Sequence, residues 1–405
     1  MRLLRQRILF RVSDIFTTFA IMMKNLILKI LFLTIPAMIF TGCSGDDDSP
    51  APECPRAVLV YMVANNSLGA AHYDTDDLNE MAIAAKQGDF GDSRLFVYHH
   101  ARNSAPVLKE ITAYGERIVA TYDNSASSVS SARMSRVVDD FRRYAPASRY
   151  GIILWSHGSG WIENGLEQSV RSNARSADEM APLSFGDDGG RYMNVTTLAA
   201  TLRGKGFDYI YFDCCYMAGV EVAYELRDCA DRIVGSVTEL PASGMPYDET
   251  LRYLLKADAD LAGAARTTFD FYNAMSGQNR TCTISVIDTS GLDALADATR
   301  AVYEANNVTS AGFAPQQFMT YKCYLFDFGQ YVDDLASQHP ELKSAFDNAL
   351  GNVIVYKAAT PRIWNVLPLT HHSGLSTGIH EFSETDGYNY GNLQWATDVA
   401  SALRR

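Results

Sequence analysis

The stretch of sequence that decides the fold is YGIILWSHGSGW, residues 150–161. Its first half, Tyr150–Trp155, is a short apolar run bounded by polar residues, which is typical of a strand buried on both faces. Its second half ends that run with Ser156 and His157 and continues into a glycine-rich turn. A buried strand followed directly by polar residues indicates a parallel sheet, because such sheets carry their ligand sites at the carboxyl ends of the strands.

Similar apolar runs recur on both sides of this stretch, and helical spacing separates them. The predicted strands are 57–63, 94–99, 150–155, 207–212 and 232–237, and the predicted helices are 68–85, 128–144, 194–203 and 217–227. Strands that alternate with helices pair in parallel, and the helices then cover both faces of the sheet. The sequence therefore predicts an α/β fold with a mostly parallel central sheet.

Beyond Pro246 the pattern changes. Helical stretches are predicted over 247–276, 289–306 and 314–357, with one strand at 282–287. The tail from Ile363 is rich in Gly, Tyr and His, which indicates irregular β structure. We therefore divide the folded part into a core, residues 56–250, and a mixed helical and irregular β region, residues 251–405, that completes the core or packs on it.

The first 43 residues indicate an export signal. The uncharged run Ile30–Phe40 is shorter than the ~20 apolar residues that span a bilayer, but it suits the apolar region of a signal peptide. It ends in Gly42-Cys43, which resembles a bacterial lipobox with Cys43 as the lipidated residue. Residues 44–55 form a polar tether with an acidic run. We expect a lipoprotein at the bacterial outer membrane or cell surface, held to the membrane through its lipid alone.

The net charge of the exported part limits the kinds of molecule that the protein can bind. Of the 35 basic and 47 acidic side chains, residues 1–43 hold six basic and one acidic, which leaves 29 basic and 46 acidic groups and a net charge of −17 on the exported part. Such an acidic surface repels phosphate backbones, which argues against nucleic-acid binding. Cationic or neutral partners fit better.

The seven cysteines are an odd, widely spaced set, which is not the pattern of a disulfide scaffold. The chain has no C-x-x-C pair, no H-E-x-x-H, no P-loop motif and no G-x-S-x-G. A structural zinc site, a zincin, a P-loop enzyme and a serine hydrolase therefore lack their signatures. The residues 187–190 (DDGG) indicate a turn before they indicate a calcium site, and we leave the presence of a metal open.

The chemistry-bearing residues follow two of the predicted strands. The strand 207–212 ends in Asp213-Cys214-Cys215, and His157 follows the strand 150–155. A Cys and a His at neighbouring carboxyl ends meet across one crevice, and a helix beginning near Met217 would stabilise the thiolate. The histidine would protonate the leaving amine, and the amides of Gly158 and Cys215 would form an oxyanion hole.

The sequence resembles the clostripain-like cysteine peptidases, relatives of caspases, gingipains and legumains. The resemblance covers about residues 57–250, and its most specific part is the Asp-x-Cys-x-Met stretch that leads into VEVAYEL. The matching segments are VYMVANNSL (60–68), LWSHGSGW (154–161), DDGG (187–190), DCCYMAGVEVAYEL (213–226) and GMPY (244–247). This resemblance implies a caspase-like αβα sandwich and a cysteine endopeptidase that cleaves after Arg or Lys.

The resemblance also implies roles for individual residues. His157 matches the catalytic histidine, Cys215 the nucleophile, and Asp213 an acidic residue of a pocket for Arg or Lys side chains. Family members often depend on calcium and cleave themselves between the His and Cys motifs, where this chain carries Arg171 and Arg175. The chemistry itself requires no cofactor, and the expected substrates are peptides or proteins with basic residues.

Several alternatives stay open. Asp213 is either a pocket wall or the cap of the following helix, and Glu239 is either a second acidic wall or a solvated loop residue. We expect Cys214 to point to the other side of the strand as a structural residue. A different primary specificity on the same fold is a further alternative. The rival from another class is a non-catalytic lipoprotein that binds peptides or glycans on a peptidase scaffold.

Overall fold

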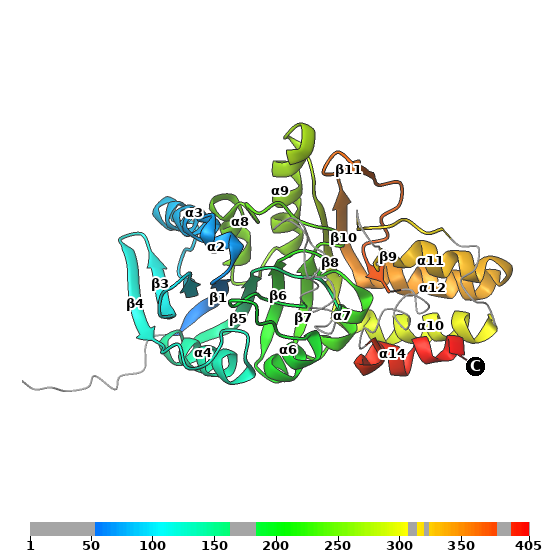
Figure 1. The fold of residues 1–405 in the computed structure, drawn as a ribbon, viewed down its shortest axis with the longest axis horizontal. Coiled ribbons are helices and arrows are strands. Elements are labelled where there is room, and N and C mark those ends of the chain that lie inside the picture. Colours follow the sequence, from blue (N-terminus) through cyan, green and yellow to red (C-terminus); the bar gives the residue numbers. More distant parts are fainter. Residues whose placement is uncertain (1–52, 163–183, 307–313, 320–323, 379–389, 405) are drawn as a thin grey trace, which may run out of the picture. The chain divides into compact units, whose positions relative to one another are not determined.

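A nine-stranded sheet organises the chain in the computed structural model (Figure 1). The structure describes residues 53–162, 184–306, 314–319, 324–378 and 390–404, all within one unit, residues 51–405. The strand order is β10-β8-β7-β6-β5-β1-β2-β3-β4. The strands of this sheet are β1 (Cys54–Ala64), β2 (Arg94–Ala101), β3 (Val107–Thr112), β4 (Gly115–Thr121), β5 (Ala147–Trp155), β6 (Phe207–Asp213), β7 (Ala230–Gly235), β8 (Thr283–Asp288) and β10 (Ile354–Ala359).

The five central strands, β2, β1, β5, β6 and β7, all pair in parallel. They are the five strands predicted within residues 56–250, because long apolar runs rich in β-branched and aromatic residues survive only where both faces of a sheet are covered. The strand predicted at 282–287 is β8. The chain leaves β1 for β2 on one side and returns to β5 on the other, so the direction of strand order changes between β1 and β5. Such a switch point opens a crevice at the carboxyl ends of the strands.

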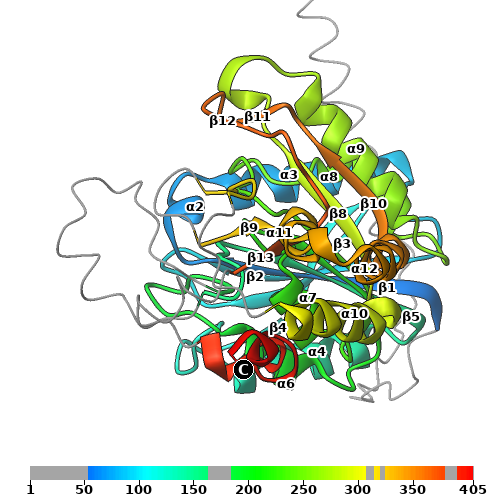
Figure 2. The same ribbon diagram turned by 90° about the vertical axis from the view of Figure 1, so that its right-hand side faces the viewer.

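Alternate side chains of β1 pack into separate cores. Leu59 and Tyr61 belong to one buried cluster, and Val58 and Val60 belong to the other. The first cluster is covered by α4 (Ser131–Tyr144), α6 (Val195–Leu202), α7 (Val220–Glu225), α10 (Leu292–Ala305), α11 (Phe328–Leu335) and α14 (Gln394–Asp398). The second is covered by α3 (Tyr73–Gln87), α8 (Tyr247–Leu254) and α9 (Leu261–Asn273). Figure 1 and Figure 2 show the two helical layers, one on each face of the sheet.

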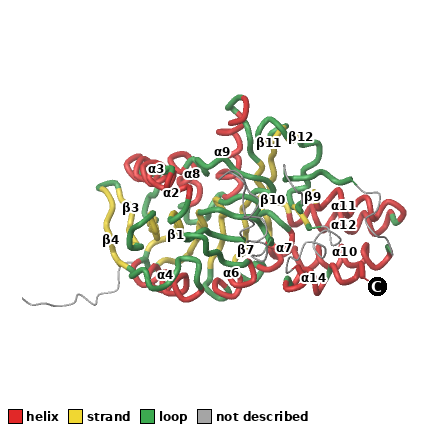
Figure 3. The backbone as a smooth tube through the Cα atoms, in the orientation of Figure 1, coloured by secondary structure: helices red, strands yellow, loops and turns green. Residues whose placement is uncertain are grey.

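The remaining elements are short or lie at the edges of these layers. They are α2 (Ser67–Ala70), α12 (Pro340–Val353), β9 (Phe326–Asp327), β11 (Arg362–Ile363), β12 (Leu367–Pro368) and β13 (Ser376–Thr377). Figure 3 shows the loops that join strands to helices above and below the sheet. No helix in the described part of the chain is long and apolar enough to cross a membrane.

The structure differs from the sequence expectations at both edges of the sheet. The hairpin β3–β4 was not predicted, because β4 is largely exposed and lacks an apolar alternation. The predicted helix 314–357 is wrong at both ends: the described residues before Phe328 are not helical and include β9 (Phe326–Asp327), and over 354–357 β10 begins and pairs antiparallel with β8. The β-branched run Val353-Ile354-Val355 favours a strand at this point. The strands β8 and β10 extend the sheet of the predicted core, and the domain boundary near residue 250 stays a prediction.

Candidate active site

A cavity of about 340 Å³ lies at the carboxyl ends of β1, β5 and β6, next to the switch point in strand order. Its lining includes Ser67, His157, Asp213, Cys215, Glu239 and Trp364. Four of these six residues are sequence-predicted site residues. We refer to this cavity as the cleft.

The register between β5 and β6 explains why the histidine and the cysteine meet there. Trp155 of β5 lies directly opposite Asp213 of β6 in the parallel ladder. His157 and Cys215 each follow their strand by two residues. Parallel neighbours carry both residues to the same edge at the same height. His157 and Cys215 therefore both reach the cleft although they are far apart in the sequence.

The imidazole of His157 is held by the segment that follows β1. Asn66 accepts hydrogen bonds from the backbone N–H of Leu68 and Gly69, at 2.9 and 3.4 Å, and so caps α2. This cap fixes Ser67, whose Oγ lies 2.9 Å from His157 Nε2. Burial lowers the pKa of His157, and the nearby Asp187 carboxylate opposes that shift without cancelling it. The histidine is therefore the neutral base form at neutral pH.

The thiol of Cys215 is half-buried and un-ionised in the resting site. Burial raises its pKa to about 12, although the Leu240 N–H, 3.4 Å from Sγ, favours the thiolate. The sequence expectation of a helix beginning near Met217 is wrong, because α7 begins only at Val220. Its dipole therefore does not act on the thiol at close range. Burial therefore favours the un-ionised thiol in the cleft that it shares with His157.

The backbone turns sharply after Cys215, the predicted nucleophile. Tyr216 has a φ of 63°, a left-handed conformation that a bulky residue rarely adopts, and its N–H donates to the Thr238 carbonyl at 2.9 Å. Cys214, one residue before the nucleophile, is buried, and its Sγ donates to the Leu154 carbonyl at 3.0 Å. Of the two adjacent thiols, Cys215 is therefore the more exposed one.

The two proposed oxyanion donors lie close together. A Cβ built on Gly158 would come within 2.7 Å of the Cys215 carbonyl oxygen and 2.9 Å of the Cys214 Cβ, so only glycine allows this approach. Within the described residues, neither the Gly158 nor the Cys215 amide donates to a backbone acceptor. Two amides that donate to no backbone acceptor among the described residues, at a strand end beside a thiol, suit an oxyanion hole.

Asp213 does not cap the following helix, so that interpretation is wrong. Gly219 is the N-cap residue of α7 and makes no side-chain cap. The Asp213 carboxylate instead accepts hydrogen bonds from the Met245 N–H at 3.1 Å and the Tyr247 hydroxyl at 3.0 Å. Burial raises its pKa, and these two donors hold it in place at the cleft. The carboxylate therefore belongs to the cleft lining.

The chain also resembles known proteins, both in sequence and in fold. The model of the clostripain family matches residues 60–354. The chain belongs to the clostripain family. It is a cysteine peptidase with the caspase-like α/β fold, and both the predicted family and the predicted fold class are confirmed. A search of curated protein sequences finds no match.

Solved structures of clostripain-family enzymes resemble the chain along most of its length. An inactive zymogen of a C11 protease from Parabacteroides distasonis is 30% identical, with a TM-score of 0.72, over 86% of this chain and 99% of that one. A secreted C11 cysteine protease from Bacteroides thetaiotaomicron, in complex with an irreversible peptide inhibitor, is 25% identical, with a TM-score of 0.69, over 85% and 99%.

Sequence reasoning missed several residues of this clostripain-family cleft. Trp364 donates its indole N–H to a Glu239 carboxylate oxygen. Asp77 of α3, fully buried, accepts from the indole N–H of the cleft residue Trp155 at 2.5 Å. Ser67 holds the histidine, and the N-cap pattern beginning at Asn66 was the available signal for it. No local pattern marks Trp364 or Asp77, because their partners lie far away in sequence.

The segment Asp187–Gly190 is a turn, as its composition predicts. The Gly190 N–H donates to Asp187 Oδ1 at 2.8 Å, and Asp188 accepts from Asn65 Nδ2 at 2.8 Å and Ser127 Oγ at 2.5 Å. Among the described residues no group of three His, Cys, Asp or Glu side chains could hold a metal ion. Cys43, Arg171 and Arg175 lie outside the described residues.

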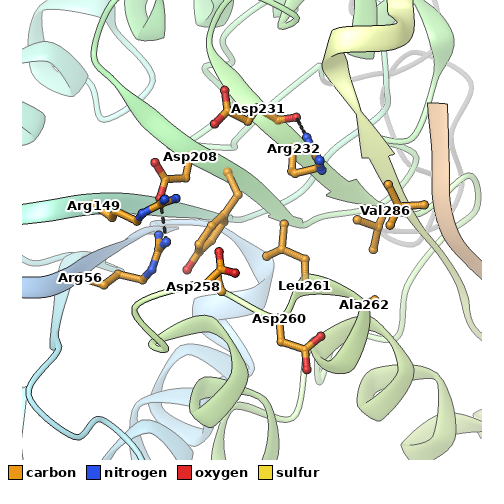
Figure 4. A pocket seen from close by; sticks show the side chains of 13 residues that line it. Arg56, Arg149, Asp208, Asp231, Arg232, Asp258, Asp260, Leu261, Ala262 and Val286 are labelled. Carbon is orange, nitrogen blue, oxygen red and sulfur yellow. Dashed lines mark hydrogen bonds and ion pairs between the residues drawn. The ribbon is translucent and has the colours of Figure 1, made fainter. Parts of the chain in front are cut away.

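A second cavity, of about 330 Å³, lies at the amino-terminal edge of the same strands (Figure 4). Its charged groups largely pair with one another. Arg56 Nη2 lies 2.7 Å and Arg149 Nη1 3.5 Å from Asp208 Oδ2, and Arg232 binds Asp288 at 3.0 Å. Parallel sheets place reactive groups at the opposite edge, and this cavity holds no nucleophile.

Proposed function

We propose that the protein is an endopeptidase that cleaves after Arg or Lys with Cys215 as nucleophile and His157 as its acid–base partner. The observation that carries the proposal is the convergence of these two side chains on one cleft of a clostripain-family enzyme. A relative's complex with an irreversible peptide inhibitor supports a peptide substrate.

The reaction begins from the neutral pair. His157 removes the thiol proton of Cys215 as Sγ attacks the scissile carbonyl, and the Gly158 and Cys215 amides stabilise the oxyanion. The imidazolium then protonates the leaving amine, and water hydrolyses the acyl-enzyme with His157 again acting as base. The pKa values of both groups favour this order, because a buried thiol loses its proton only to a base beside it.

Two carboxylates support a preference for basic side chains. Asp213 and Glu239 both line the cleft. A cationic Arg or Lys side chain in this cleft gains charge-assisted hydrogen bonds, whereas a neutral side chain gives neither carboxylate a cationic partner. The acidic exported part, with a net charge of −17, also attracts basic peptides at long range.

The test compares Cys215→Ala with Cys214→Ala on reporter peptides that carry Arg, Lys, Ala or Glu before the scissile bond. We expect Cys215→Ala to lose hydrolysis to background, at least ~10³-fold, because the other thiol that lines the cleft, Cys214, is buried and donates to the Leu154 carbonyl. Cys214→Ala is the matched control, a neighbouring thiol outside the reaction, and should retain hydrolysis.

Full activity in the Cys215→Ala variant, or inactivity confined to Cys214→Ala, would contradict the assignment of the nucleophile. Equal rates on basic and neutral reporters would remove the preference for Arg and Lys. The same panel run with calcium and with a chelator decides whether calcium is needed for activity.

Self-processing and lipid anchoring complete the proposal. Arg171 and Arg175 offer basic cleavage sites between the two catalytic motifs, and Cys43 offers the lipid attachment site of a cell-surface lipoprotein. We expect purified wild-type protein to separate into two fragments and the Cys215→Ala form to stay intact.

We also expect Cys43→Ser to release the protein from the membrane fraction. A permanently intact active enzyme, or unchanged membrane attachment, would reject the corresponding step.

A further inference from the structure

The hairpin β11–β12 lies beyond the family-matched residues 60–354 and yet contributes a residue to the cleft. Figure 2 shows the hairpin on the same side of the sheet as α9. Trp364 and Asn365 form its tip with φ values of 51° and 56°, and the Val366 N–H closes the turn on the Ile363 carbonyl at 2.9 Å. Two consecutive non-glycine residues in the left-handed region are unfavourable, and they persist only where surrounding contacts hold them.

Three hydrogen bonds hold this turn. The Trp364 N–H donates to the buried Thr281 hydroxyl at 3.1 Å, which ties the tip to the segment before β8. Arg362 donates to the carbonyls of Asn365 and Val366, at 3.3 and 3.2 Å. These contacts stabilise an unfavourable turn. The turn places the half-buried indole of Trp364 in the cleft.

The indole N–H of Trp364 donates to the carboxylate of Glu239, 125 residues away in sequence. The next residue, Leu240, donates its N–H to Cys215 Sγ at 3.4 Å, so the Glu239 segment also borders the nucleophile. An indole is a neutral donor. It orients the carboxylate without cancelling its charge, as an arginine partner would, and leaves the second oxygen for another donor.

We propose that Trp364 is a specificity-determining positioning residue that holds the Glu239 carboxylate toward the cation of a basic substrate residue. The inference rests on the proposed preference for Arg and Lys and deepens it. A carboxylate fixed in advance binds a guanidinium or ammonium group without the entropic cost of ordering a free side chain. The ring adds a cation–π face to the same wall of the cleft.

The test substitutes Trp364→Phe, which keeps an aromatic ring and removes the indole N–H. We expect KM for reporters with a basic residue before the scissile bond to rise about five- to tenfold with kcat little changed, while kcat/KM on neutral reporters stays the same. Glu239→Gln should give the same pattern. The double variant should be no worse than Glu239→Gln alone, because both changes remove one contact.

Val366→Ala is the matched control, because it alters a side chain of the same turn that is 63% exposed and does not line the cleft. If Trp364→Phe fails to fold, Glu239→Gln examines the same contact with the hairpin intact. Additive losses in the double variant, or an equal loss on basic and neutral reporters, would overturn the inference. Unchanged basic specificity in Trp364→Phe also overturns it and leaves the proposed function standing, whereas a wild-type enzyme without basic preference refutes both.

Discussion

At the scale of single residues, the site is distinguished by a thiol and an imidazole whose pKa values favour their uncharged forms. Burial raises the pKa of Cys215 and lowers the pKa of His157, so it favours the uncharged form of each side chain. A neutral thiol is a weak nucleophile, which protects it from oxidation and alkylation when no substrate is bound. In the proposed mechanism, deprotonation of the thiol requires a correctly oriented His157, and Ser67 contacts that imidazole.

Replacing Ser67 by Ala removes the hydroxyl that contacts His157 Nε2. We expect kcat to fall about two- to tenfold, as for the loss of one hydrogen bond, with KM unchanged because the substrate-binding carboxylates are untouched. The measurement is steady-state kinetics on a basic reporter peptide. Ser104→Ala, an exposed serine at the end of β2, serves as control. A rise in KM at constant kcat would show that Ser67 binds substrate instead.

At the scale of elements, helices α3 and α8 enclose an acidic cluster beside the cleft. Asp77 is buried next to Asp213, and burial followed by that neighbouring charge raises the pKa of Asp77. Burial raises the pKa of Glu80 to about 7, although the Tyr247 N–H donates to it. Above pH ~4 such carboxyls stay protonated in the folded protein but ionise in the unfolded chain. Because the folded state then binds more protons, the free energy of unfolding falls as the pH rises.

The variant Asp77→Asn removes the carboxyl whose pKa is raised more than that of Glu80, and it keeps an oxygen acceptor for the Trp155 indole. We expect the wild-type free energy of unfolding to decline relative to the variant between pH 5 and pH 8, as measured by urea denaturation at each pH. Asp76→Asn, an exposed neighbour on α3, should run parallel to wild type. Parallel curves for wild type and Asp77→Asn would show that Asp77 titrates normally.

At the scale of the whole molecule, the C-terminal region completes the sheet and the cleft. The antiparallel strand β8 covers the edge of β7, and α9 covers apolar side chains of the second core. Trp364, from the same region, lines the cleft. The region therefore contributes to folding and to substrate binding together.

A chain limited to residues 56–250 should not fold cooperatively. It lacks β8 and α9, so it exposes a strand edge and an apolar face that native proteins keep covered. We expect residues 56–405 to give a sharp thermal transition with near-ultraviolet circular dichroism, and residues 56–250 to give neither. A cooperative transition in the shorter chain would establish the predicted boundary near 250 as that of an independent domain.

The sequence predicted the parts of the fold that are encoded locally. The five parallel strands were found because each is a nearly unbroken apolar run, and the exposed strand β4 was missed because it is not. The strand β10 was taken for the end of a helix, since pairing with β8 is a long-range contact that no short window of sequence contains. The start of α7 was placed three residues early, which led to the wrong expectation of a dipole-stabilised thiolate.

By itself, the sequence determined the family and the class of fold, and it predicted that His157, Cys215 and Asp213 lie at one edge of the sheet, because a strand and the motif at its end are adjacent in the chain. The tertiary structure decided which distant groups complete the cleft and in which state the dyad rests. Ser67 and Trp364 line the cleft, and Asp77 contacts its lining residue Trp155, through strand order and helix packing that a local pattern does not encode. The protonation of the thiol follows from burial, and burial exists only once the chain has folded.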